Sequence, residues 1–169
     1  MGAGKTSIGR ALAALLRWSF VDLDHEIEHQ ERKPIREIFR LQSEREFREI
    51  ETRTLQRILE QVSAPTVIAL GGGTFVQTGN VEMLRNAGAR MVFLDTPLEE
   101  MVERCVVGGE PLGESLRPLA SDRDAFRELY TQRLPRYDAA ELTLSTAGKT
   151  AEENAREIAT RLGLVAGAR

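Results

Sequence analysis

The chain begins with a glycine-rich segment, G-A-G-K-T-S at residues 2–7, that runs directly into an amphipathic stretch. Apolar residues recur at helical spacing from Ile8 to Leu16, which predicts a helix over about residues 5–17. This arrangement is the second half of the pattern G-x-x-x-x-G-K-[ST], in which backbone amides surround phosphate oxygens. Lys5 can reach terminal phosphates, and the Thr6 hydroxyl can hold Mg²⁺. The segment therefore predicts a nucleotide site at the positive end of this helix.

The first glycine of that pattern, and the apolar strand that feeds the loop, would both precede Met1. We therefore expect that the first strand of the fold is missing from this chain, through a misplaced start or a fragment. In folds with this loop the feeding strand usually lies inside the sheet, so its omission should leave ladder groups unpaired and part of the core uncovered. The alternative is a glycine-rich N-terminus that merely leads into a helix.

Composition sets limits on the class of protein. The 169 residues, 41% hydrophobic and 29% charged, are typical of one soluble globular domain. A net charge of −3 argues against a general nucleic-acid surface, so an anionic small ligand needs locally placed cations. Cys105 is the single cysteine, which excludes an intrachain disulfide and a cysteine-based metal site. With neither a membrane-spanning run nor a signal-peptide core, we expect a cytoplasmic protein without membrane or nucleic-acid partners. We also expect a monomer.

Strands and helices alternate along the chain. Strands are expected at residues 20–24, 66–70, 91–94 and 142–144, with a mainly helical, charged segment at 25–62. Ser43 and Glu46 form a capping-box pattern, so a helix is expected to start at Ser43. Further helices are expected across residues 81–84, from Pro97, from 121 to 135, and over 150–162. Apolar strands separated by helices predict a single α/β domain, a three-layer α/β/α fold with a parallel sheet. Residues 107–120, rich in glycine and proline, are a mobile-loop candidate.

Ligands in such folds bind beyond the carboxyl ends of the strands, where this chain carries Asp22, Asp24 and glycines at 71–73. Two carboxylates on one strand face suit metal and hydroxyl positioning. The alternative is that they cap the next helix, as Asp24 alone could do, whereas Asp22 could not easily do so as well. The glycines indicate either a loose turn or a close approach of a ligand to the backbone.

Arginines supply the candidate anion sites. Arg48 either pairs with Glu44 or Glu51 on its own helix or lies beside the packed face as an anion clamp, and the pattern alone slightly favours the pair. Arg133 falls in the last turn of its helix, where the helix dipole is a sufficient reason for a cation. His25 and His29 have the spacing of helical metal ligands, but no further ligand accompanies them, which favours a solvated surface.

The chain closely resembles the shikimate kinase family in six motifs and in their order. These are G-A-G-K-T-S-I-G-R, D-L-D, E-F-R, G-G-G, R-P-L and R-L-P-R-Y. Each motif is weak alone, but the ordered set is specific and spans nearly the whole chain. The resemblance implies a small P-loop kinase, of the P-loop NTPase fold and the nucleoside-monophosphate-kinase type. It further implies transfer of the terminal phosphate of ATP to the 3-hydroxyl of shikimate, in aromatic amino-acid biosynthesis.

The resemblance also implies roles for particular residues. Asp24, Lys5 and the lid residue Arg117 match catalytic positions, with residues 25–62 as substrate-binding helices and 107–120 as the lid. Mg²⁺ is implied with ATP, held by Thr6 and, through water, by Asp22. The substrate-binding positions are Asp24, Arg48, Gly71, Gly72, Gly73 and Arg133, with the two arginines on the shikimate carboxylate. The ATP-binding positions are Gly2, Ala3, Gly4, Lys5, Thr6, Ser7, Arg104, Arg117 and Lys149.

Two other functions fit parts of the pattern. One is a catalytically impaired or regulatory module that binds a nucleotide or metabolite on the same scaffold. The other is a related sugar-acid kinase, such as a gluconate kinase, against which the D-x-D, F-R and G-G-G set argues.

Overall fold

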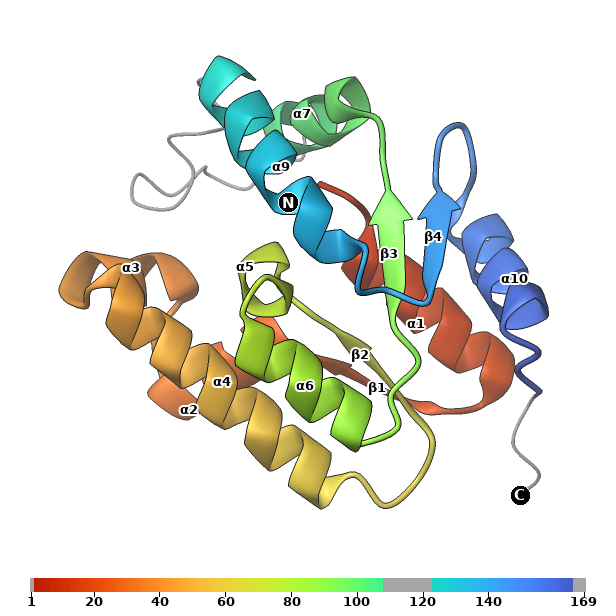
Figure 1. Cartoon of the computed structure of the whole chain (residues 1–169), viewed down its shortest axis with the longest axis horizontal. Coiled ribbons are helices and arrows are strands. Elements are labelled where there is room, and N and C mark those ends of the chain that lie inside the picture. The colour runs from red at the N-terminus through yellow and green to blue at the C-terminus, as the bar shows by residue number, and fades with distance from the viewer. Residues whose placement is uncertain (1, 108–122, 166–169) are drawn as a thin grey trace.

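The structure, a computed structural model, describes residues 2–107 and 123–165 (Figure 1). Residues 108–122 lie outside this range and include Arg117 and nearly all of the loop expected at 107–120. The first part of the fold consists of α1 (Lys5–Leu16), β1 (Ser19–Asp22), α2 (Leu23–Glu31), α3 (Ile35–Leu41), α4 (Glu44–Gln61), β2 (Thr66–Ala69) and α5 (Gly72–Phe75). The second part consists of α6 (Thr78–Asn86), β3 (Val92–Asp95), α7 (Leu98–Val107), α9 (Arg123–Tyr137), β4 (Leu142–Ser145) and α10 (Ala151–Arg161).

The helices form where the sequence supplies both an apolar face and a terminus. In α1, Ile8, Leu12 and Leu16 recur at helical spacing and are buried. The Ser43 hydroxyl accepts a hydrogen bond from the Glu46 backbone N–H at the start of α4, and the Glu46 carboxylate accepts one from the Ser43 N–H. The capping box predicted there is confirmed.

Two boundaries differ from the sequence-based expectation. The strand expected at residues 20–24 ends at Asp22, and Asp24 already belongs to α2. The helix expected to end near Pro135 continues to Tyr137, so Pro135 lies inside α9.

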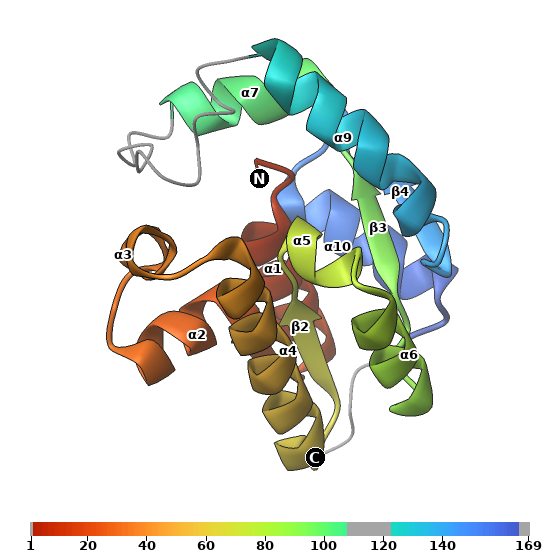
Figure 2. The same ribbon diagram turned by 60° about the vertical axis from the view of Figure 1, so that its left-hand side comes forward.

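The strands are parallel, as predicted, but they form two separate pairs. β1 pairs with β2, with Val21 opposite Ile68, and β3 pairs with β4, with Leu94 opposite Leu144. Helices α1 and α10 lie on one side of the strands and α4 and α6 on the other (Figure 2). Neighbouring residues of β2 contribute to different core clusters. Val67 packs with the α1–α10 cluster, and Ile68 packs with the α4 cluster. The strands are therefore covered on both faces, and the three-layer arrangement is confirmed.

An apolar cavity of about 540 Å³ lies between the two strand pairs. Its walls include residues 66–69 of β2, residues 92–94 of β3, and Ile8 and Leu12 of α1. Within the described residues, β2 pairs only with β1 and β3 only with β4, so the edges that border the cavity have no strand partner. The unpaired edges of β2 and β3 and the cavity between them confirm the expectation of unpaired ladder groups and an incompletely covered core.

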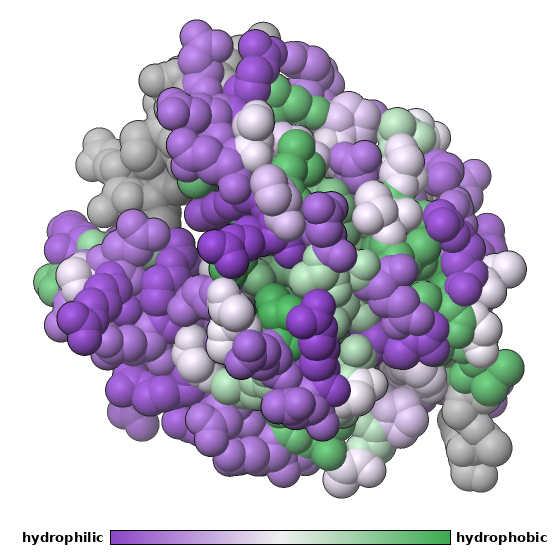
Figure 3. All heavy atoms as spheres, viewed as in Figure 1, coloured by the Kyte–Doolittle hydropathy of each residue, from purple (hydrophilic) through white to green (hydrophobic). Residues whose placement is uncertain are grey.

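The surface of the molecule is mostly polar on the face seen in Figure 1. Hydrophilic side chains cover the region of α3 and α4, and apolar side chains show nearer the middle of this face (Figure 3). Among the described residues, no helix combines the length and the apolarity needed to cross a bilayer.

Candidate active site

The glycine-rich segment forms a tight turn at the start of α1. Gly2 and Gly4 have φ angles of 68° and 76°, in the left-handed region that glycine adopts without strain. A Cβ at Gly2 would lie 2.5 Å from the Met101 carbonyl oxygen, so this position also lacks room for a side chain. The Gly4 carbonyl accepts the first helical hydrogen bond, from Ile8 N–H at 2.8 Å. The turn thus directs the N-terminus of α1 toward open space, as an anion site requires.

A cavity of about 290 Å³ opens in front of this turn. It is lined by Gly2, Ala3, Gly4, Lys5, Thr6, Ser7, Asp22, Asp24, Ala69 and Leu70. The structure therefore brings the predicted phosphate loop and the two predicted acids together at the carboxyl ends of β1 and β2.

Asp22 serves two purposes in this cavity. Its Oδ1 accepts a hydrogen bond from the Asp24 N–H at 3.1 Å and so caps α2, while its Oδ2 accepts one from the Thr6 hydroxyl at 2.7 Å. The argument that Asp22 could not easily act as a cap is wrong, as is the placement of both acids on one strand face. The cause is the early end of β1, because Asp22 is the last extended residue and its carboxylate lies over the first turn of α2.

Asp24 faces the cavity from that first turn. Asp24 is exposed at the cavity that it lines, but the protein around it partly desolvates its carboxyl group. This desolvation, together with the negative charge of Asp22, raises the pKa of the Asp24 carboxyl, and the Lys5 ammonium opposes the rise. Glu51 adds to the upward shift of the pKa. Asp24 is thus a carboxylate whose proton affinity is increased at the mouth of a predicted phosphate site.

Glycines at 71–73 form the first turn of α5, so the chain does not make a loose turn here. A Cβ at Gly71 would lie 3.5 Å from Asp24 Oδ1, and one at Gly72 would lie 3.6 Å from Arg133 Nη1. At Gly73 a Cβ would collide with the Arg48 guanidinium. Each glycine therefore lies beneath a different predicted site residue, which favours the close-approach interpretation of the three glycines.

Arg48 forms ion pairs with both acids predicted as its partners, Glu44 and Glu51. Its Nη2 donates to Glu44 Oε1 at 3.0 Å, and its Nη1 donates to Glu51 Oε2 at 2.6 Å. The Arg48 side chain is 22% exposed, whereas that of Glu51 is 2% exposed. The guanidinium also lies against Gly73, so the ion pairs do not turn it away from the glycine turn. The two interpretations of Arg48 are compatible.

Glu51 is a residue whose importance the sequence reasoning missed. Its second oxygen, Oε1, accepts a hydrogen bond from the Thr74 hydroxyl at 2.6 Å, so both carboxylate oxygens have partners. The available signal was its place on α4, four residues before the buried Leu55. An acid on the apolar face of a helix needs a partner, because an unpaired buried charge is costly.

Tyr137 attaches α9 to the glycine turn. Its ring stacks on Phe93 at a centroid distance of 4.3 Å, and its hydroxyl donates to the Gly72 carbonyl at 3.4 Å. Burial raises the pKa of Tyr137, and the neighbouring Arg133 opposes that rise. The tyrosine was noted only as part of the R-L-P-R-Y motif. Its contacts place Arg133 on the same turn that Arg48 contacts.

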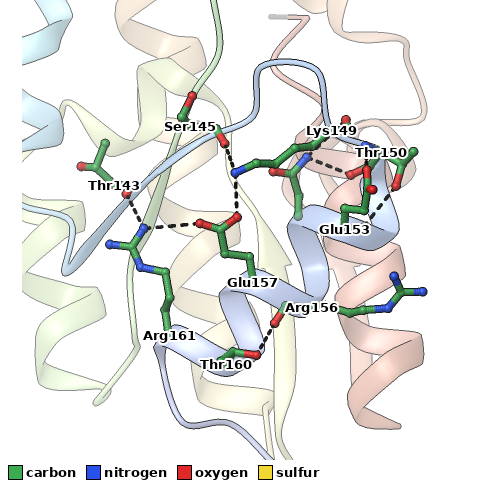
Figure 4. A network of polar contacts seen from close by, with 10 residues as sticks. Thr143, Ser145, Lys149, Thr150, Glu153, Arg156, Glu157, Thr160 and Arg161 are labelled. Carbon is green, nitrogen blue, oxygen red and sulfur yellow. Dashed lines mark hydrogen bonds and ion pairs between the residues drawn. The ribbon is translucent and has the colours of Figure 1, made fainter.

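Of the three predicted ATP-binding residues outside the glycine-rich turn, the structure describes contacts for Lys149. The Lys149 ammonium donates to the Ser145 carbonyl at 3.1 Å and pairs with Glu157 at 2.7 Å, within a polar network along α10 (Figure 4). Arg104 belongs to α7, and Arg117 lies outside the described residues. The ATP-binding roles of these three residues remain predictions.

Comparison with known proteins gives a consistent result. A sequence model of the shikimate kinase family matches residues 1–163. A shikimate kinase from Persephonella marina is 37% identical over 163 residues, covering 96% of this chain and 94% of the relative. A solved shikimate kinase from Acinetobacter baumannii, in complex with shikimate, matches with a TM-score of 0.83 at 35% identity, covering 96% of this chain and 89% of the other. The enzyme from Aquifex aeolicus matches with a TM-score of 0.80 at 29% identity, covering 96% and 92% of the two chains.

Proposed function

The chain belongs to the shikimate kinase family, and we propose that the cavity in front of the glycine-rich turn carries out the reaction of that family. The chain is an ATP-dependent kinase that phosphorylates the 3-hydroxyl of shikimate, a step of aromatic amino-acid biosynthesis. The proposal concerns the residues that do this. One observation carries it, namely that Asp24, Arg133 and Arg48 lie against residues 71–73, while Asp24 also lines the cavity in front of the phosphate loop.

The two arginines bind the carboxylate of shikimate in this proposal. Arg48 comes from α4 and Arg133 from α9, and both guanidinium groups lie against the glycine turn. A guanidinium presents several N–H donors in a plane, which suits a carboxylate better than a single ammonium does. Glu51 and Glu44 leave Arg48 partly neutralised, so Arg133 supplies the second positive charge for the anion.

Asp24 orients the reacting hydroxyl and accepts its proton. As the hydroxyl oxygen bonds to the γ-phosphorus, the bond from that phosphorus to the bridging oxygen of ADP breaks, and the proton passes to Asp24. Its raised pKa makes the carboxylate a better proton acceptor than an ordinary aspartate. Phosphoryl transfer depends mostly on positioning and charge neutralisation, which a fixed first-turn carboxylate provides.

The turn at residues 2–7 holds the phosphates of ATP, with its amides and Lys5 as donors. A Mg²⁺ ion fits the Thr6–Asp22 pair, because these two hard oxygen groups are hydrogen-bonded to each other at 2.7 Å beside the loop. Mg²⁺ commonly takes only one or two protein ligands and fills its remaining positions with phosphate oxygens and water. When bound there, the ion would neutralise charge on the phosphates. Lid closure by Arg117, ATP contacts by Arg104 and Lys149, and a monomeric state complete the proposal.

The test is ADP release by the purified chain with ATP and Mg²⁺, with and without shikimate. We expect release that depends on shikimate. Asp24→Asn should lower kcat by at least about 100-fold, the lower end of what a general base contributes, with ATP affinity nearly unchanged. Asp138→Asn, which alters an exposed carboxylate, is the matched control and should keep wild-type turnover.

The contrary outcomes are distinct. ATP binding without shikimate-dependent turnover would contradict the enzymatic function and favour a binding module. Turnover with gluconate in place of shikimate would contradict the substrate. Unchanged kcat in Asp24→Asn would remove Asp24 from the mechanism while leaving the function in place.

A further inference from the structure

Three buried polar residues, Glu51, Thr74 and Asn80, form a hydrogen-bonded chain that begins at Arg48. Thr74 is 0% exposed, Asn80 1% and Glu51 2%, and they come from α5, α6 and α4 in turn. The Thr74 hydroxyl donates to Glu51 Oε1, and Asn80 Nδ2 donates to the Thr74 carbonyl at 3.0 Å. Buried polar groups in folded proteins are normally hydrogen-bonded, and here each hydrogen bond joins two different helices.

Glu51 connects this chain to the site. One of its oxygens accepts from Thr74 and the other accepts from Arg48, both at 2.6 Å. A carboxylate with both oxygens occupied has little freedom to rotate. If the Thr74 hydroxyl were absent, Glu51 Oε1 would be a buried acceptor without that donor, and the carboxylate would turn toward other N–H groups. The Arg48 guanidinium already donates to this carboxylate and would move with it.

Thr74 is also part of the turn beneath the arginine. Its backbone N–H donates to the Gly71 carbonyl at 3.1 Å and so closes the first turn of α5. A Cβ at Gly71 would lie 3.1 Å from the Thr74 hydroxyl oxygen and 3.3 Å from Glu51 Oε1. One residue thus shapes the glycine turn through its backbone and the acid behind Arg48 through its side chain.

We propose that Thr74 is a positioning residue for substrate recognition, whose hydroxyl fixes the Glu51 carboxylate and thereby holds the Arg48 guanidinium over Gly73. The inference rests on the proposed function, in which Arg48 binds the carboxylate of shikimate. Thr74 does not touch the substrate in this proposal. Its main effect is therefore expected on the affinity for shikimate, because its hydroxyl is bonded to the acid that holds Arg48.

The test replaces the hydroxyl by a methyl group of similar size. Thr74→Val should raise the KM for shikimate about tenfold, as expected for loss of a buried hydrogen bond to a charged group, with the KM for ATP and kcat within about twofold. Thr74→Ser restores a hydroxyl and should return the KM for shikimate to near the wild-type value. If the valine variant does not fold, Thr74→Ala removes the same hydroxyl with a smaller side chain.

Thr54→Val is the matched control. Thr54 is 1% exposed and lies on α4 with Arg48, but its hydroxyl bonds to Gln30 at 3.2 Å instead of Glu51. The same substitution there should change thermal stability without changing the KM for shikimate. An equal rise in KM in both valine variants, or no rise in Thr74→Val, would overturn the positioning role.

Arg48→Ala separates this inference from the proposed function. If Arg48→Ala leaves the KM for shikimate unchanged, the carboxylate role of Arg48 fails and the Thr74 inference fails with it. If Arg48→Ala raises the KM and Thr74→Val does not, the Thr74 inference alone fails. If Arg48 binds the carboxylate and Thr74 positions Arg48, Thr74→Val should raise the KM less than about twofold in the Arg48→Ala background. The effects of two residues that act through one another are not additive.

Discussion

At Gly73 a single missing side chain determines where a guanidinium can lie. An added Cβ would collide with the end of Arg48, which is a flexible side chain, so Arg48 can move while the backbone stays. We expect Gly73→Ala to raise the KM for shikimate about tenfold, since displaced charge-assisted hydrogen bonds carry about that much affinity. The melting temperature should change little. Steady-state kinetics and thermal unfolding measure the two effects.

Gly79→Ala is the control for that substitution. Gly79 lies in α6, and a Cβ there would meet no atom within 4 Å. Alanine is favoured over glycine in helices by up to about 1 kcal/mol, so this variant should be equal or more stable, with unchanged kinetics. A wild-type KM in Gly73→Ala would contradict the close fit between the glycine turn and Arg48.

Site residues differ in how well the sequence could predict them. Lys5, Thr6 and Arg48 lie in ordered motifs; Lys5 and Thr6 line one cavity with Asp24, and Arg48 lies against Gly73. Glu51 and Thr74 were not predicted as a pair, because they are 23 residues apart and meet only after α4 and α5 pack. A buried threonine in a sequence has no signature that distinguishes a hydrogen-bonded partner from a packing residue.

Among the helices, α10 gives a pH-dependent test of its capping box. The Thr150 backbone N–H donates to Glu153 Oε2 at 2.7 Å, and this bond, with that from the Thr150 hydroxyl, lowers the pKa of Glu153 below 4.5. A lowered folded-state pKa means that the stabilisation is complete above the unfolded pKa and is lost as the pH falls through the folded one. Glu153→Ala should therefore be less stable than wild type at pH 7, and the difference should shrink below about pH 4.5.

Urea unfolding across pH 3–7 measures this dependence, with Glu152→Ala as the control. Glu152 is an exposed acid of the same first turn, without the cap bonds of Glu153. Its substitution matches the change in charge and in helix propensity. A stability loss in Glu153→Ala that is the same at pH 3 and pH 7 would show that the carboxylate does not stabilise α10 as an anion.

Element types were largely predictable, and their ends were less so. The sequence located α1, by its apolar spacing, α4, by its capping box, and α10 to within about two residues, which is the usual uncertainty at helix ends. The sequence could not show that α9 passes Pro135, because Tyr137 packs on Phe93 and Gly72 and these contacts hold the last turn. β1 ends early because the Asp22 carboxylate caps α2 by accepting a hydrogen bond from the Asp24 N–H.

On the scale of the whole molecule, the cavity between β2 and β3 should accept an extended apolar segment. Its walls combine apolar side chains with two strand edges, and a parallel strand inserted there would pair with both. We expect a peptide of about six residues rich in valine and isoleucine to raise the melting temperature and to slow amide hydrogen exchange in β2 and β3. The same peptide with a central proline is the control, because proline cannot donate to a ladder. Equal effects of the two peptides would contradict strand insertion.

The same two edges affect how copies of the chain behave toward one another in concentrated solution. An open strand edge is a template for pairing with any other extended chain, and β2 and β3 present two such edges beside an apolar hollow. A partly unfolded neighbour can supply the missing partner, so the sheet that shapes a catalytic pocket also sets the tendency of the chain to aggregate. If the open edges of β2 and β3 cause aggregation, turbidity should rise steeply with protein concentration and should fall when the valine-rich peptide is present.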